Sequence, residues 1–122
     1  MKIIERGWAG HFICADRCMF KRNTLIEGHG DSVIVSTVGS MLSEKGGSLE
    51  PIGAFGRYYE TMVFGAAKVG CYIDADVHDQ RNVESKWAIC ADNFKDLPDN
   101  VDNKANEMHE AIVAEFAKKL KS

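Results

Sequence analysis

Beyond Asp99 the apolar residues recur at every fourth position, the spacing that places side chains on one face of an α-helix. They are Met108, Ile112, Phe116 and Leu120, with Ala105 and Val113 widening the stripe. Asp99 can cap the start of such a helix, and lysines in the last turn complement the negative end of its dipole. The sequence therefore predicts one amphipathic helix over about residues 100–121.

The part of the chain before this helix has the shorter period of β-strands. In residues 71–76, Cys71, Ile73 and Ala75 alternate with Tyr72, Asp74 and Asp76, so we expect one face in the core and the other facing solvent or a ligand. Glycine-rich or polar stretches at 43–51 and 77–84 are predicted to be loops. The candidate strands are 2–5, 10–16, 23–27, 32–38, 57–66, 71–76 and 86–90.

These elements predict an α+β fold: a mainly antiparallel sheet of about six strands with the long C-terminal helix packed on one face. We expect a single domain over residues 1–122, with the sheet in 1–92. One helix near 10 Å wide covers only part of such a sheet, because its strands lie about 4.8 Å apart. Symmetric self-association would cover the surplus apolar surface, so a homodimer or higher homo-oligomer is expected.

Composition narrows the classes of function. The 122 residues carry a net charge of −3, without the basic excess that a duplex-binding protein uses on phosphates, so we expect no duplex nucleic acid partner. No apolar run approaches the ~20 residues that span a bilayer, and the N-terminus lacks a secretion signal. We therefore expect a cytoplasmic protein with reduced cysteines and no membrane partner.

The cysteines and histidines suggest two chemistries, and both are disfavoured. His11, Cys14, Cys18 and His29 could be a zinc set, but His11 and Cys14 fall on opposite faces of a strand. Cys18 lies between Arg17 and Lys21, which would favour its thiolate, yet no partner base is recognisable. We expect buried thiols, with no metal, no cofactor and no catalytic residue, and hence no enzyme.

Arginines near strand edges and turns are better candidates for function. Arg17, Arg22 and Arg57 offer the planar guanidinium that binds two phosphate oxygens at once. Tyr59 and Phe94 are among the aromatic residues that could stack on a base, and Asn93 precedes the helix, whose free N–H groups favour anions. The competing interpretation places the aromatics in the core and pairs the arginines with carboxylates. The candidate ligand-binding residues are Arg17, Arg22, Arg57, Tyr59, Asn93 and Phe94.

Four runs of residues add a resemblance that covers nearly the whole chain. They are Arg-Gly-Trp-Ala-Gly-His-Phe-Ile-Cys-Ala-Asp-Arg-Cys at 6–18, Arg-Asn-Thr-Leu at 22–25, Arg-Tyr-Tyr-Glu-Thr at 57–61 and Asp-Asn-Lys-Ala-Asn at 102–106. Together they resemble a family of small phage and prophage proteins, the first Thoeris anti-defence family. The resemblance implies a non-enzymatic, oligomeric sponge. Such proteins sequester cyclic ADP-ribose-type messengers of TIR-domain defence enzymes, uncleaved, in pockets between subunits.

Two other functions remain open from the residues alone. The acidic side chains Asp74, Asp76, Asp79, Asp96 and Asp99 could bind a protein of another bacterial defence system. A small thiol enzyme would use Cys18 as its nucleophile. The three functions differ in what each protein would retain: an intact nucleotide, a protein partner or a reaction product.

Overall fold

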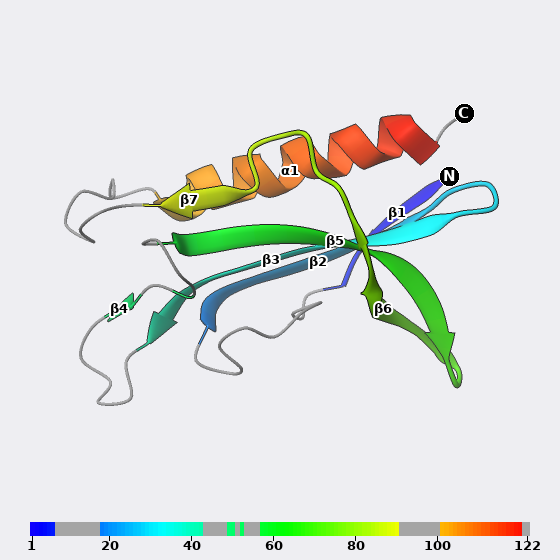
Figure 1. Ribbon diagram of the computed structural model, residues 1–122, viewed down its shortest axis with the longest axis horizontal. Helices are drawn as coiled ribbons and strands as arrows, with labels where there is room; N and C mark the ends of the chain where they lie inside the picture. Colours follow the sequence, from blue (N-terminus) through cyan, green and yellow to red (C-terminus); the bar gives the residue numbers. More distant parts are fainter. Residues whose placement is uncertain (7–17, 43–48, 51, 53–56, 91–100, 121–122) are drawn as a thin grey trace.

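The computed structural model describes residues 1–6, 18–42, 49–50, 52, 57–90 and 101–120 (Figure 1). The described elements are seven strands and one helix, in the order sheet then helix. They are β1 Lys2–Glu5, β2 Cys18–Glu27, β3 Ser32–Leu42, β4 Leu49–Glu50, β5 Arg57–Val69, β6 Tyr72–Arg81, β7 Ala88–Cys90 and α1 Val101–Leu120.

All strand pairs are antiparallel, and the main sheet has the order β1-β2-β3-β5-β6. The short strand β4 pairs with the end of β3, and β7 pairs with the first part of β5. The helix lies along one side of the sheet (Figure 1). The predicted α+β class, with an antiparallel sheet and a C-terminal helix packed on one face, is confirmed.

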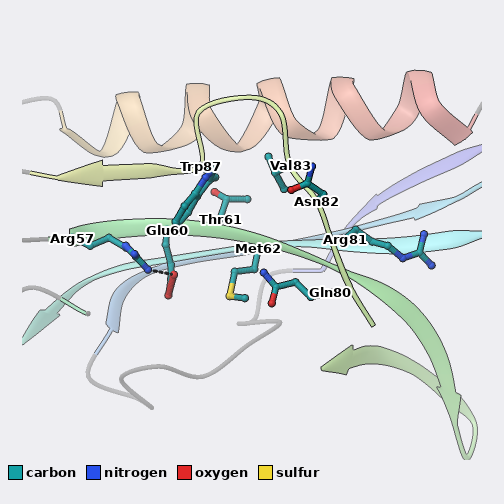
Figure 2. Close-up of a pocket in the computed structure, with 9 residues that line it drawn as sticks. All are labelled: Arg57, Glu60, Thr61, Met62, Gln80, Arg81, Asn82, Val83 and Trp87. Atoms are coloured by element: carbon teal, nitrogen blue, oxygen red, sulfur yellow. Dashed lines mark hydrogen bonds and ion pairs between the residues drawn. The ribbon is translucent and has the colours of Figure 1, made fainter. Parts of the chain in front are cut away.

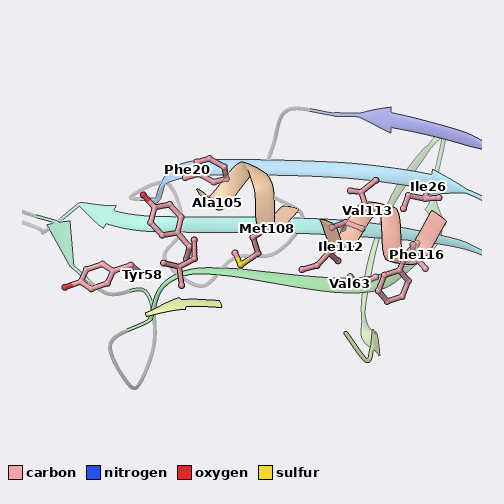
Figure 3. Packing of buried hydrophobic residues seen from close by; sticks show 13 residues of the cluster. Phe20, Ile26, Tyr58, Val63, Ala105, Met108, Ile112, Val113 and Phe116 are labelled. Atoms are coloured by element: carbon pink, nitrogen blue, oxygen red, sulfur yellow. The ribbon is translucent and has the colours of Figure 1, made fainter. Parts of the chain in front are cut away.

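The apolar stripe predicted for the helix is the side that packs on the sheet. Met108, Ile112, Val113 and Phe116 are all buried, and Ala105 is fully so. Figure 3 shows them against side chains of β2, β3 and β5, which alternate so that every second residue faces the helix. We call this side of the sheet the helix face; it includes Phe20, Ile26, Val33, Val35, Tyr59 and Val63.

The residues between these positions lie on the opposite side of the sheet, which we call the far face. Its buried apolar members include Leu25, Ile34 and Phe64, which are cross-strand neighbours in β2, β3 and β5. Asn23, Ser36 and Glu60 are buried there as well. The far face is therefore a second buried layer that includes polar groups.

Two predictions about the strand after Gly70 are wrong. Strand β6 continues to Arg81, although residues 77–84 were predicted as a loop. Ile73 and Ala75 are only half-buried and Cys71 is exposed, so the alternation in 71–76 does not mark a core face. The reason is that β5 and β6 shift register after Phe64, and the hairpin beyond this point bends away from the helix (Figure 1).

Other strand boundaries differ in length. β2 begins at Cys18, within the predicted connection 17–22, while β3 and β5 extend beyond their predicted ends at 38 and 66. β7 is shorter than the predicted strand 86–90. The predicted strand 10–16 lies outside the described residues. Among the helices in the described part of the chain, none has the length and apolar character needed to cross a membrane.

Candidate functional site

A pocket of about 480 Å³ lies at the edge of β5, between the stretch that pairs with β6 and the stretch that pairs with β7. The chain leaving β6 passes this gap and returns as β7, and the amide of Thr61 donates to the carbonyl of Trp87 there. Glu60 and Met62 point away from the helix and Thr61 points toward it, so the pocket spans both faces of the sheet edge (Figure 2). Its lining is Arg57, Glu60, Thr61, Met62, Gln80, Arg81, Asn82, Val83 and Trp87.

Arg57 and Trp87 form the most distinctive pair in this pocket. The guanidinium carbon of Arg57 lies 4.8 Å from the centroid of the Trp87 ring, a cation–π arrangement. Arg57 Nη1 donates to Glu60 Oε2 at 3.0 Å, so a buried carboxylate also holds the guanidinium. Trp87 remains 41% exposed. The pocket thus presents an oriented cation next to an accessible flat ring, and guanidinium groups can bind several oxygens at once.

Arg81, the second cation of the lining, is already neutralised. Its guanidinium bonds Asp31 and Asp79, and these hydrogen bonds raise the pKa of Arg81 and lower the pKa of both carboxyl groups. Asp79 reaches this position because Gly65 has no Cβ; one built there would lie 2.0 Å from Asp79 Oδ2. Arg81 bonds two carboxylates and shapes the wall of the pocket, whereas Arg57 bonds one, Glu60, and so keeps more of its donors for an anion.

The structure separates the predicted site residues. Arg22 lies on the helix face, where it donates to Glu5, Asn106 and Glu110, and the bond to Glu5 is the main cause of its raised pKa. Tyr59 is 1% exposed and packs edge-to-face on Phe20, with ring centroids 5.7 Å apart. Arg57 is the predicted residue that lines the pocket. The other three, Arg17, Asn93 and Phe94, lie outside the described residues.

Sequence reasoning missed a hydrogen-bonded chain beneath the helix. His109 is fully buried, with Nε2 2.7 Å from Thr24 Oγ1 and Nδ1 2.7 Å from Thr37 Oγ1. Thr24 donates its proton to Glu5, so it accepts from His109 Nε2–H, and Thr37 then donates to Nδ1. Thr61, part of the pocket lining, lies 2.6 Å from Thr37 and completes the chain. The position of His109 within the apolar stripe of the helix is the signal that could have found it.

This environment keeps His109 neutral. Burial, with a smaller effect from nearby Arg22, lowers the pKa of His109 to about 4, which outweighs the opposite effects of Glu5 and Glu110. The imidazole serves here as a hydrogen-bond bridge between two strands. Because both ring nitrogens are used, it has no free position for a substrate proton.

The described residues contain no group of three His, Cys, Asp or Glu side chains that could hold a metal ion. The pocket lining includes neither histidine nor cysteine, and its carboxylate, Glu60, is bound to Arg57. The free thiols of Cys71 and Cys90 are both exposed. The pocket is therefore equipped to bind and orient a ligand through one cation, one aromatic ring and several neutral polar groups.

Within the described residues, fold and site define a class: an α+β protein with one helix on an antiparallel sheet and a pocket at the sheet edge. Compared with known proteins, the chain matches no family model, no curated protein and no solved structure.

Proposed function

We propose that this protein binds and sequesters a cyclic ADP-ribose-type nucleotide without cleaving it, as a phage anti-defence protein acting in the host cytoplasm. The observation that carries the proposal is the Arg57–Trp87 pair in the pocket. Arg57 would bind a phosphate, and Trp87 offers a flat face to the base or to a ribose ring. The resemblance of the four sequence runs to the Thoeris anti-defence family points to the same ligand class.

The size and chemistry of the pocket suit this ligand. Its volume of about 480 Å³ falls in the range of small-molecule sites, roughly 300–1,000 Å³. Arg57 is held by both Glu60 and Trp87, so little side-chain freedom is lost when a phosphate binds. Such preorganisation favours tight binding, which an inhibitor that depletes a messenger requires. Homo-oligomerisation, which the resemblance implies, belongs to the same proposal.

The test is capture and release. Purified protein is mixed with cyclic ADP-ribose, free ligand is removed, the protein is heat-denatured and the released small molecules are analysed by mass spectrometry. We expect intact messenger to be recovered in proportion to protein. Recovery of a hydrolysed product would instead show an enzyme, and no recovery would refute sequestration of this ligand.

Variants connect the result to the pocket. Trp87→Ala and Arg57→Lys should each reduce the recovered messenger by about tenfold, since loss of stacking or of a bidentate contact is worth ~1–3 kcal/mol. Tyr72→Ala is the matched control for Trp87, because Tyr72 is an exposed aromatic residue outside the pocket lining. Lys68→Ala is an exposed cationic control for Arg57. Equal losses of recovered messenger in the two control variants would show that the pocket is not the binding site.

A second candidate function has one observation in its favour. The exposed side chains of Tyr72 and Val77 lie on β6 together with Asp74 and Asp76, in the hairpin that bends away from the helix (Figure 1). An apolar and acidic projection of this kind suits a protein partner. Retention of a stoichiometric host protein at moderate salt, lost in Tyr72→Ala but not in Trp87→Ala, would favour this function over sequestration.

A further inference from the structure

Gln80 is a residue of the pocket lining that its neighbours in the chain hold in place. It is the penultimate residue of β6, and it lies between Asp79 and Arg81, whose side chains are bonded to each other at 2.9 Å. Arg81 also bonds Asp31, in the connection between β2 and β3. These ion pairs fix the chain on both sides of Gln80, while Gln80 itself is exposed. The pocket wall therefore presents a carboxamide from a well-fixed strand.

The register of β6 sets the direction in which this carboxamide points. Gly65 pairs with Asp76, and the preceding residue, Phe64, pairs with Gln80, so the register passes over residues 77–79. Bulges of this kind re-aim side chains and are common next to active sites. Because Gln80 lies opposite Phe64, its side chain is on the far face of the sheet.

Met62 supplies an apolar floor beside the Gln80 amide. It lies two residues before Phe64 on the same side of β5, which makes it the diagonal cross-strand neighbour of Gln80. Figure 2 shows both side chains on the same side of β5 as Glu60. Met62 is half-buried, and a thioether makes favourable contacts with aromatic rings. This part of the pocket thus combines an apolar surface for a flat ring with a group that can recognise the edge of that ring.

The same side of β5 connects the carboxamide with the cation of the pocket. Glu60, which accepts from Arg57 Nη1, is two residues before Met62, a separation of about 7 Å along a strand. The guanidinium, the apolar floor and the carboxamide therefore follow one another along the pocket. A ligand with a phosphate at one end and a base at the other matches this order.

We propose that Gln80 recognises the adenine base of the sequestered nucleotide, with Oε1 accepting from the 6-amino group and Nε2 donating to N7. This pair of hydrogen bonds is the usual way in which a glutamine distinguishes adenine from other bases. The base packs on Met62, the phosphate binds Arg57, and the ring of Trp87 is left to the ribose. The inference rests on the proposed function and deepens it, because it names the part of the ligand that the pocket selects.

The first experiment compares cyclic ADP-ribose with its inosine counterpart, in which an oxygen replaces the 6-amino group, by isothermal titration calorimetry. The inosine base offers two acceptors at the edge that Gln80 contacts, so wild-type protein should bind this compound about tenfold more weakly. In Gln80→Leu the adenine compound should fall to the level of the inosine compound. Gln80→Arg should prefer the inosine compound, since a guanidinium donates to both acceptors at once.

Two variants in the same pocket are matched controls. Asn82→Leu removes the other exposed carboxamide of the lining, which lies beyond the end of β6, and it should leave the ratio of the two dissociation constants unchanged. Arg57→Lys should weaken both compounds by the same factor, because the phosphates are common to them. A ratio near one in wild type, a preference for adenine that persists in Gln80→Leu or Gln80→Arg, or a preference lost in Asn82→Leu would overturn the assignment of the base. Sequestration would still stand in each of these cases.

The second experiment distinguishes recognition of the base from a structural role of Gln80. Because Gln80 is exposed, Gln80→Leu should leave the melting temperature of ligand-free protein unchanged. Thr37→Val, which removes a buried hydroxyl bonded to Thr61 and His109, is the control and should lower it. A lower melting temperature in Gln80→Leu would show that the fold itself uses the amide, and the proposal would be wrong. If wild type captures neither compound, the proposed function fails and this inference fails with it.

Discussion

Two neighbouring residues of β2, Thr24 and Asn23, lie on opposite faces of the sheet and differ in how their buried polar side chains are satisfied. On the helix face, Thr24, Thr37, Thr61 and His109 satisfy one another in a continuous chain. On the far face, the amide of Asn23 is buried without a partner among the described residues. The sheet is the same and the residues are immediate neighbours, so the difference lies in what covers each face. The helix supplies His109 as a partner to one of them.

This difference distinguishes polar groups that stabilise the fold from polar groups that remain available to a ligand. A closed network of hydrogen bonds stabilises the fold and leaves nothing for a ligand, as the three partners of Arg22 also illustrate. The guanidinium of Arg57 is oriented by Trp87 and Glu60 but does not use all of its hydrogen-bond donors on them, so it can still bind a ligand. Substitutions on the helix face should accordingly change the stability of the protein.

The largest effect is expected from Ile112→Ala. Ile112 is fully buried between the helix and the sheet (Figure 3), and truncating such a side chain should lower the free energy of unfolding by about 2–5 kcal/mol. Urea denaturation measures this loss. Glu107→Ala, on the exposed side of the same helix, is the control and should change stability by no more than about 0.5 kcal/mol. A loss below about 1 kcal/mol at Ile112 would mean that the helix does not close this core.

The helix shows how far sequence reasoning reaches. Its stripe could be predicted because apolar residues at helical spacing have one physical explanation, burial of that face. The hairpin beyond Gly65 could not, because Ile73 and Ala75 alternate with Asp74 and Asp76 as in a strand with one core face, yet all four residues are half-buried. Alternation indicates a strand, but it does not say which layer covers each side.

The site residues show a second limit. Arg22 and Arg57 looked equivalent in the sequence, since both are arginines near strand edges. Their difference comes from distant partners: Asn106 and Glu110 reach Arg22 from the helix, while Trp87, the residue before β7, reaches Arg57. Tyr59 illustrates the same point, because the strand register alone decided that its ring packs on Phe20. The chemistry of a side chain can be predicted from the sequence, whereas the residues that contact it depend on the topology of the fold.

The second largest effect is a pH dependence due to His109. In the unfolded chain this histidine takes up a proton below about pH 6.5, but in the folded protein its pKa is about 4. Between these values the unfolded state binds more protons, so stability falls as pH falls, by up to about 3 kcal/mol from pH 6.5 to 4. His109→Gln should remove most of this slope, because glutamine can donate and accept but does not titrate. The free energy of unfolding of both proteins is measured by denaturation at pH 6.5, 5.5 and 4.5. An unchanged slope in His109→Gln would mean that another group causes the pH dependence.

A smaller effect is expected where the helix face ends. Gly39 lies between Phe20 and Tyr59 across three strands, and a Cβ built there would lie 2.3 Å from Tyr59 Cδ1 and 2.8 Å from the Tyr58 carbonyl. Gly39→Ala must displace the Tyr59 ring or the backbone, so we expect a loss of about 1–3 kcal/mol. The double variant Gly39→Ala, Tyr59→Leu should lose less than the sum of its parts if the ring is the obstacle. If the two losses of stability simply add, the contact with the Tyr58 carbonyl is the obstacle instead.

The smallest effect concerns the segment that borders the pocket. Desolvation alone would raise the pKa of Glu115, but hydrogen bonds from Ser85 Oγ, the amides of Glu84 and Ser85, and Lys119 lower it to about 2. In the unfolded chain the pKa of Glu115 is near 4.5, so the stabilisation by its ionised carboxylate is complete above pH 4.5 and is lost as pH falls toward 2. This pH range lies below most of the range in which His109 affects stability. Glu115→Gln should reduce stability by about 1–2 kcal/mol at pH 7, measured by urea denaturation. Faster amide hydrogen exchange in residues 82–87 with unchanged exchange in β2 would show that Glu115 fixes the pocket wall to the helix, and a uniform acceleration would show that it supports the whole fold.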